Sequence, residues 1–146
     1  MASTLQLLRD MIAIPSVNPM RAKSGESVEK GMANFIETIL SAASIDCERQ
    51  TVAEGRDNVI AVVHSTGSNA NGLMLNSHMD TVPVDNMSIK PFDPVIENGC
   101  VFGRGSCDAK ASIASMMSAL IEYANQSERP RPAIFAAMAD EEFGFT

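Results

Sequence analysis

The feature that most restricts the fold is an alternation of short apolar runs with a longer amphipathic stretch. The runs Val59–Val63, Leu73–Leu75 and Ala133–Met138 have the length and the apolar content of buried strands. Between the second and third runs, residues from about Ala109 to Ala124 carry apolar side chains at helical spacing. Strands that alternate with helices predict an α/β fold, with a mainly parallel sheet flanked by helices.

Two further helices are predicted ahead of these strands. Ser3–Gln6 has the pattern of a capping box, and Pro15 ends the first helix. The apolar positions at helical spacing in this first helix are Leu5, Leu8 and Ile12. The second helix begins near Ser27, and its apolar positions are Val28, Met32, Phe35, Ile36, Ile39, Leu40 and Ala43.

Residues 81–105 are rich in proline and glycine and predict a long irregular segment. A short strand pair is expected within it, near Val95 and Val101. Loops of this length in a compact domain are often functional.

Composition limits the partners of the chain. With 146 residues, 45% of them hydrophobic, the chain suits one compact domain with a buried core. A net charge of -7 argues against nucleic acid and against anionic membrane surfaces. No apolar run approaches the ~20 residues that span a bilayer, and the first residues do not resemble a secretory signal. Cys47, Cys100 and Cys107 have no Cys-x-x-Cys spacing, which fits reduced thiols and a cytoplasmic location.

Histidine and acidic residues follow the predicted strands. His78 and Asp80 come after Leu73–Leu75, and Glu141 and Glu142 come after the last strand. A third acidic residue, Asp108, precedes the predicted helix. Because the carboxyl ends of parallel strands meet at one sheet edge, these three segments are expected to converge there.

These residue types can build a metal site. Residues two apart in an extended segment point to the same side, so His78 and Asp80 could face one cavity, with Asp80 orienting the imidazole. Asp108 could bridge two cations with its two oxygens. One of Glu141 and Glu142 could bind metal while the other takes a proton from a metal-bound water.

Each of these motifs also has an ordinary structural interpretation. His78 and Asp80 could be structural or solvated residues at a strand end. Asp108 could be a helix N-cap, and Glu141-Glu142 could be a solvated acidic patch. Convergence on one edge weakens all three alternatives together without removing them.

Other reactive residues are weaker candidates. His64 ends a strand and is expected to be structural. Cys107 could form a nucleophilic pair with a histidine, but packing as a small apolar residue is the preferred interpretation. The "GRGS" stretch lacks a complete phosphate-loop motif and is expected to form a tight turn that aims Asp108.

Three motifs resemble a known family when they are taken in order. "LNSHMDTVPV", "VFGRGSCDAKASIASM" and "ADEEFG" resemble the dinuclear zinc deacylases and exopeptidases. This family includes acetylornithine deacetylase, succinyl-diaminopimelate desuccinylase, aminoacylase and the glutamate-releasing carboxypeptidases. The early "LLRDMIAIPSVNP" is similar to the opening helix and loop of the same family.

The resemblance implies a role for each residue of the candidate site. It implies that His78 binds one zinc and that Asp80 sets the basicity of this histidine. Asp108 would be the bridging carboxylate, followed by a cis peptide bond. Glu141 would be the general base, and Glu142 would bind the other zinc.

The resemblance also implies an activity and a domain organisation. Family members hydrolyse amide bonds of N-acyl amino acids or small peptides with a metal-activated water, using two divalent ions, zinc or cobalt. They are much longer and commonly homodimeric. Residues 1–146 are therefore expected to be the N-terminal portion of an incomplete zinc-exopeptidase-like catalytic domain. The lid domain and the C-terminal part would be absent.

A chain of this kind is expected to be inactive alone and to leave apolar surface uncovered. Two alternatives stay open: a non-catalytic remnant or interaction module, and one half of a two-chain enzyme.

Overall fold

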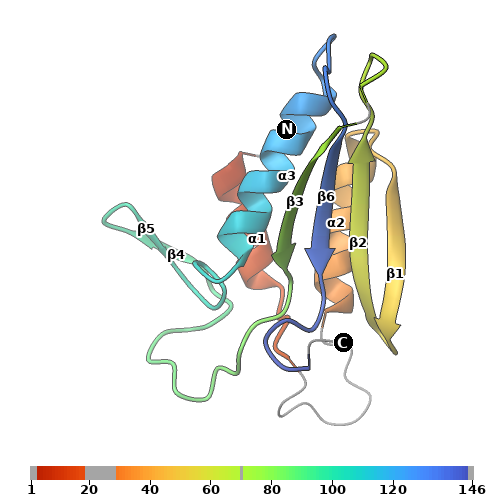
Figure 1. Cartoon of the computed structure of the whole chain (residues 1–146). Coiled ribbons are helices and arrows are strands. Elements are labelled where there is room, and N and C mark those ends of the chain that lie inside the picture. Colours follow the sequence, from red (N-terminus) through yellow and green to blue (C-terminus); the bar gives the residue numbers. More distant parts are fainter. Residues whose placement is uncertain (1–2, 19–28, 70, 145–146) are drawn as a thin grey trace.

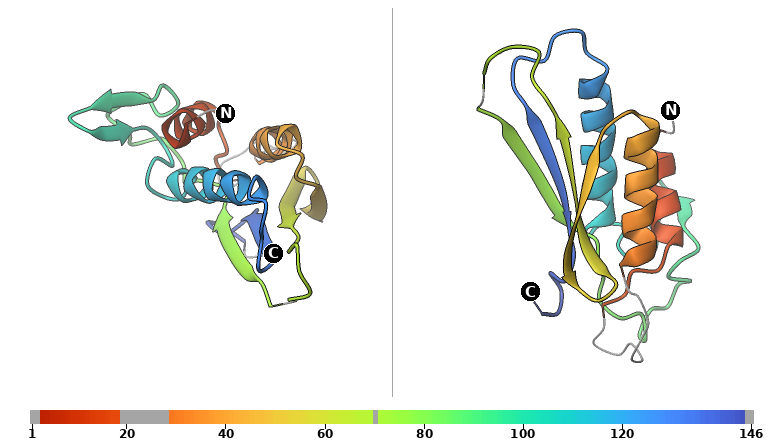
Figure 2. Two further views of the ribbon diagram at one scale, coloured as in Figure 1. Left: turned by 90° about the horizontal axis from the view of Figure 1, so that it is seen from above. Right: turned by 90° about the vertical axis from the view of Figure 1, so that its right-hand side faces the viewer.

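The computed structural model describes residues 3–18, 29–69 and 71–144. Its helices and strands are α1 (Thr4–Ala13), α2 (Lys30–Ala42), β1 (Cys47–Ala53), β2 (Arg56–Val63), β3 (Leu73–His78), β4 (Val95–Glu97), β5 (Cys100–Phe102), α3 (Lys110–Ala124) and β6 (Ala133–Met138). Figures 1 and 2 show a sheet with α2 and α3 on one face, and with α1 packed against α3 (Figure 1, Figure 2). The α/β class and the flanking helices predicted from the sequence are confirmed.

The four-stranded sheet is mixed, in the order β1-β2-β6-β3. β3 runs parallel to β6, whereas β2 is antiparallel to both β1 and β6. The prediction of a mainly parallel sheet is therefore wrong. One reason is the antiparallel strand β1, which was not predicted because its sequence CERQTVA lacks the apolar pattern of a buried strand. β1 turns back at Gly55, which has a φ of +72°, and forms a hairpin with β2.

The predicted start of α1 is confirmed, because the Ser3 hydroxyl accepts a hydrogen bond from the Gln6 amide at 3.2 Å. The Gln6 side chain donates to Asp10 instead of returning to Ser3, so only half of a capping box forms. The buried face differs in part from the prediction, since Leu5 is 45% exposed. The residues of α1 that are buried are Leu7, Met11 and Ile12.

The other predicted elements agree with the structure. α2 buries Met32, Ile36 and Leu40, while Ser27 and Val28 lie outside the described residues. The predicted strand Ala133–Met138 has the observed bounds of β6. The expected pair near Val95 and Val101 is the hairpin of β4 and β5, which projects from the body of the molecule (Figure 1).

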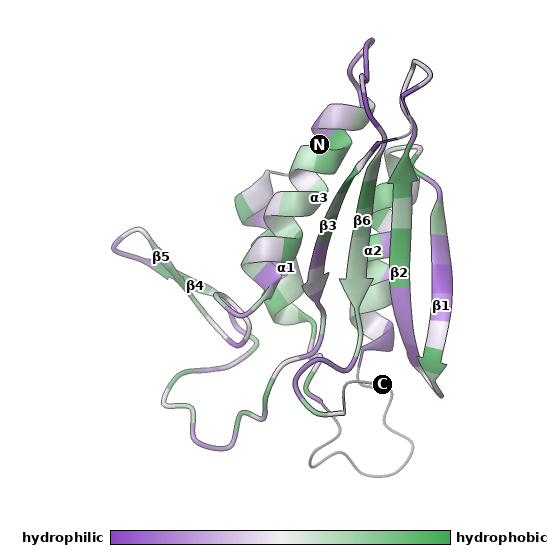
Figure 3. Cartoon of the chain, in the orientation of Figure 1, coloured by the Kyte–Doolittle hydropathy of each residue, from purple (hydrophilic) through white to green (hydrophobic). Residues whose placement is uncertain are grey.

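The hydropathy of the chain changes along the sheet (Figure 3). Apolar residues line β6 and the second half of β2, and Phe135, at 0% exposure, lies among them. Polar residues gather where β3 and β6 end and where β2 begins. Burial of apolar area stabilises the centre of the sheet, whereas its lower end in Figure 3 is polar.

None of the helices among the described residues is long and apolar enough to cross a membrane. Cys47, Cys100 and Cys107 are free thiols, as expected. Cys107 is exposed, so the prediction that it packs as a small apolar residue is wrong.

Candidate metal centre

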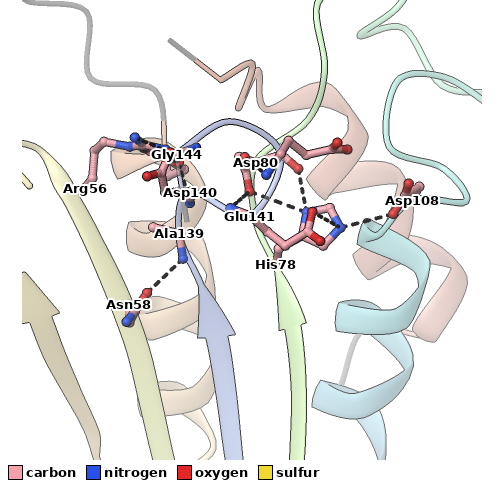
Figure 4. A network of polar contacts seen from close by, with 11 residues as sticks. Arg56, Asn58, His78, Asp80, Asp108, Ala139, Asp140, Glu141 and Gly144 are labelled. Carbon is pink, nitrogen blue, oxygen red and sulfur yellow. Dashed lines mark hydrogen bonds and ion pairs between the residues drawn. The ribbon is translucent and has the colours of Figure 1, made fainter. Parts of the chain in front are cut away.

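The carboxyl ends of β3 and β6 bring the candidate residues together. The two strands are parallel neighbours with His78 opposite Met138, so the segments that follow them leave the same edge of the sheet. Asp80 and Glu141 belong to these two segments, and Asp108 reaches the same place from the loop before α3 (Figure 4). The convergence predicted from the sequence is therefore present.

The His78 ring lies at the middle of the cluster. Its Nδ1 is 3.0 Å from the backbone oxygen of Asp80 and 3.4 Å from the Asp80 carboxylate. Both of these groups are acceptors, so Nδ1 carries a hydrogen and donates it. In the neutral ring, Nε2 then presents its lone pair to Asp108 Oδ1 at 3.0 Å and to Glu141 Oε2 at 3.8 Å. A lone pair that faces two carboxylates requires a cation between them, either a proton or a metal ion.

Hydrogen bonds and charges shift the pKa values in the cluster. The hydrogen bond with Asp80 raises the pKa of His78 to about 9, against the opposing effect of burial and with a further contribution from Asp108. Burial would raise the pKa of Asp80, but hydrogen bonds from His78 and two backbone amides outweigh it and lower that pKa. Burial and the nearby Asp108 charge raise the pKa of Glu142. The cluster as a whole favours bound positive charge.

Asp80 is 0% exposed and connects the two strand ends. Its Oδ1 accepts the Glu141 amide at 3.1 Å, and its Oδ2 accepts the Glu142 amide at 2.9 Å. The same carboxylate lies against the His78 ring. One buried side chain thus fixes the ring and the backbone that carries both glutamates.

The donor set fits a zinc ion. Ligand atoms of His78, Glu141 and Glu142 all lie within 4.8 Å of one another. Imidazole nitrogen and carboxylate oxygen are ligands that zinc accepts at distances of about 2.0–2.2 Å. The His78 side chain is 12% exposed and that of Glu141 is 52% exposed, so the cluster is anchored in the fold and open to solvent. A substrate could reach it.

The structure separates the alternatives for Asp108. The N-cap of α3 is Ala109, and no side chain caps this helix end, so the N-cap interpretation of Asp108 is wrong. The Asp108 side chain is 77% exposed and lies against His78. The peptide bond between Asp108 and Ala109 is cis, as the family resemblance implied.

His64 lies apart from this cluster, at the exposed end of β2. Its backbone oxygen accepts a hydrogen bond from Arg129, in keeping with the structural role expected for it.

Four polar residues behind the cluster were not anticipated from the sequence. Asn58 accepts the Ala139 amide at 2.8 Å, and Arg56 contacts both Glu29 and Asp140. All are buried. The available signal was the pair Arg56 and Asn58 at the start of an otherwise apolar strand.

A groove of about 940 Å³ lies between the ends of the three helices, away from these residues. It is lined by residues that include Ser3, Leu7 and Ile121. It lies near the carboxyl end of α3, whereas Asp108 lies before the amino end. Among the described residues that line it, there is no histidine and one acidic residue, Glu122. Because it lacks convergent titratable groups, the chemistry is assigned to the cluster around His78.

The sequence and the fold both have known relatives. Residues 74–145 match peptidase family M20/M25/M40. The chain is 33% identical to an acetylornithine deacetylase of Proteus mirabilis over 143 residues, which cover 94% of this chain and 35% of that protein. It is also 33% identical to a succinyl-diaminopimelate desuccinylase of Delftia acidovorans, with 97% of this chain and 36% of that protein covered.

A solved M20 family metallo-carboxypeptidase of Sulfolobus solfataricus has the same fold, with a TM-score of 0.79 at 23% identity. The match covers 97% of this chain and 32% of that one. The present chain spans about a third of the length of the curated relatives that it matches. Sequence and fold agree: residues 74–145 match peptidase family M20/M25/M40, and the fold is that of a solved member of the M20 family.

Proposed function

We propose that this chain is part of a metal-dependent hydrolase that cleaves amide bonds in N-acyl amino acids or small peptides. The observation that carries the proposal is the His78 Nε2 atom, which faces carboxylates from two other segments at 3.0 and 3.8 Å. The printed names of the relatives, a deacetylase, a desuccinylase and a metallo-carboxypeptidase, support the same reaction class.

His78, Asp108 and Glu142 are the residues that would hold the divalent ions, zinc or cobalt, of which we propose two. Bound zinc would polarise the amide carbonyl and lower the pKa of a water molecule to roughly 7. Glu141 would take the proton from this water on a carboxylate oxygen and pass it to the leaving amine nitrogen. Asp80 would hold the His78 ring with Nε2 directed at the ion.

We infer that the 146 residues correspond to the N-terminal portion of a metallopeptidase-like catalytic domain. The curated relatives are about three times as long. The complete hydrolase would then take further metal ligands and its substrate selectivity from residues outside this sequence.

Zinc binding by the 146-residue chain tests this proposal. In equilibrium dialysis with metal analysis, we expect His78→Ala to weaken zinc binding by about tenfold or more, because it removes the nitrogen ligand. His64→Ala is the matched control, since it removes the other histidine of the chain from an exposed strand end. Equal zinc binding by the His78 variant and the unmutated chain would refute the proposed site.

A further inference from the structure

A buried group of three charged side chains lies directly behind the candidate centre. The Arg56 guanidinium binds Glu29 with two parallel contacts, Nε to Oε2 at 2.8 Å and Nη2 to Oε1 at 2.5 Å. Its third nitrogen, Nη1, lies 2.6 Å from Asp140 Oδ1. The side chains of Arg56, Glu29 and Asp140 are 10%, 0% and 2% exposed. Two carboxylates thus share one guanidinium away from solvent.

The group holds the residue next to the glutamates. Asp140 immediately precedes Glu141, and its amide donates to Glu29 Oε1 at 3.2 Å. The register of β2 and β6 pairs Val59 with Ala137. If that register is continued past the end of β6, Arg56 stands opposite Asp140. The pairing of β2 with β6 therefore places the guanidinium beside the turn that follows β6, at residues 139–144.

The turn is held from both sides (Figure 4). Asp80 accepts the amides of Glu141 and Glu142 on the side of His78. On the other side, Asp140 is held by Arg56 and accepts the Gly144 amide at 3.1 Å. Asp140 has a φ of +66°, a left-handed conformation that a residue other than glycine seldom adopts. A strained residue persists only where its surroundings fix it.

The geometry explains why an arginine is needed here. A planar guanidinium can donate to two carboxylates in fixed directions, whereas an ammonium group is a point charge without that fork. Loss of the positive charge would leave two buried carboxylates beside each other, which is strongly unfavourable. Space is limited as well, because a side chain at Gly144 would collide with the Asp140 carboxylate.

We infer that Arg56, together with Glu29, is a positioning unit for the metal centre: by holding Asp140, it directs Glu141 and Glu142 toward His78. This inference rests on the proposed function for its consequence, and on the contacts above for the positioning itself. The side chain of Arg56 contacts Glu29 and Asp140 behind the centre, so its effect passes through the turn.

Arg56→Lys is the first test, because it keeps the positive charge and removes the planar guanidinium that donates to both carboxylates. Glu29→Gln is the second variant, since it keeps the size of the side chain and leaves Arg56 paired with Asp140. Arg49→Lys is the matched control. Arg49 also places two nitrogens on one carboxylate, that of Glu37, but it does so at a partly exposed site on β1.

Two measurements on the 146-residue chain separate positioning from general destabilisation. By NMR hydrogen exchange without metal, we expect Arg56→Lys to speed exchange of the Glu141 and Glu142 amides by roughly tenfold more than that of the buried Met117 amide in α3. By cobalt titration, we expect the affinity to fall by about tenfold and the visible spectrum of the bound ion to change. Glu29→Gln should move both measurements in the same direction by less, and Arg49→Lys should move neither.

The outcomes distinguish the two proposals. Uniform exchange changes and unchanged cobalt binding in both variants would overturn the positioning role and leave the metal site standing. Absence of cobalt binding by the unmutated chain would refute the metal site. The acceleration of Glu141 and Glu142 amide exchange in Arg56→Lys, relative to that of Met117, would then still decide whether Arg56 holds the turn.

Discussion

Asp80 joins parts of the candidate centre that are more than sixty residues apart in the sequence. Its carboxylate is fully buried, and all of its contacts described above are with the His78 ring or the amides of Glu141 and Glu142. A buried carboxylate is stable only when such donors replace water. The same contacts set the tautomer of His78 and the path of the turn.

Asp80→Asn should therefore weaken both stability and metal binding. The amide side chain keeps the size but presents an NH2 donor group where a backbone amide of the turn needs an acceptor, which costs about 1–3 kcal/mol of unfolding free energy. Zinc affinity should fall by about 10–100-fold because the histidine loses its orienting carboxylate. Urea unfolding and zinc competition measure the two effects.

Asp93→Asn is the control for Asp80→Asn. The Asp93 side chain is 65% exposed and paired with Lys90, so this variant should change neither stability nor zinc affinity. Unaltered zinc affinity in Asp80→Asn would contradict the orienting role.

Lys110 connects two helices through a buried ammonium group. It lies in the first turn of α3 at 0% exposure, and its Nζ donates to the backbone oxygens of Met11 at 3.0 Å and Ile14 at 2.8 Å. These oxygens are at the carboxyl end of α1, where the last carbonyl groups lack the regular helical hydrogen bond, and the Met11 oxygen also accepts the Ile14 amide at 3.1 Å. The contact fixes α1 against the start of α3, close to Asp108.

This contact predicts a pH dependence of stability. Burial, with a smaller effect of the Arg104 charge, lowers the pKa of Lys110 from 10.5 to about 7. Between pH 7 and 10.5 the unfolded chain then binds more protons than the folded chain, so the contribution of Lys110 to the unfolding free energy rises with pH. Below pH 7 this contribution is constant. Lys110→Met should remove it.

The difference between the unmutated chain and Lys110→Met isolates this contribution from other titrating groups. Urea unfolding of both proteins at pH 7 and pH 9 should give a difference that favours the unmutated chain more at pH 9. A difference that is the same at both pH values would contradict a lowered pKa of Lys110.

The elements that could be predicted are those whose sequence pattern is local. β6 is an apolar run between polar residues, and α3 has five buried apolar residues at helical spacing, so the sequence predicts both. It does not predict β1, because an exposed strand of charged and polar residues is stabilised by pairing with β2 rather than by its own pattern. The residues of the candidate centre could be predicted as well, because they lie just after predicted strands or within the motifs that resemble the family. The Arg56 network depends on the register between β2 and β6, which a single sequence does not reveal.

The molecule as a whole exposes apolar residues around its sheet. Leu73 and Met74 are 59% and 58% exposed on β3, and the described part of the chain pairs this strand on one side only. Ile96 and Phe102 of the projecting hairpin are also exposed. Exposed apolar strands with an open edge favour association with other chains.

We expect the 146-residue chain to self-associate as its concentration rises. Sedimentation velocity should show a growing average mass, and Met74→Lys should reduce it, because a charge on this strand opposes edge pairing. Leu5→Lys, at a 45% exposed position on α1, is the control and should leave the association unchanged. A monomer at every concentration would contradict the prediction.

The most direct test of the central claim is X-ray absorption at the zinc edge of the zinc-loaded chain. We expect nitrogen and oxygen ligands at about 2.0–2.2 Å, with an imidazole signal that His78→Ala removes and His64→Ala keeps. An imidazole signal that survives in His78→Ala, or a sulfur ligand at about 2.3 Å from a thiol such as Cys107, would place the metal elsewhere and contradict the proposed site.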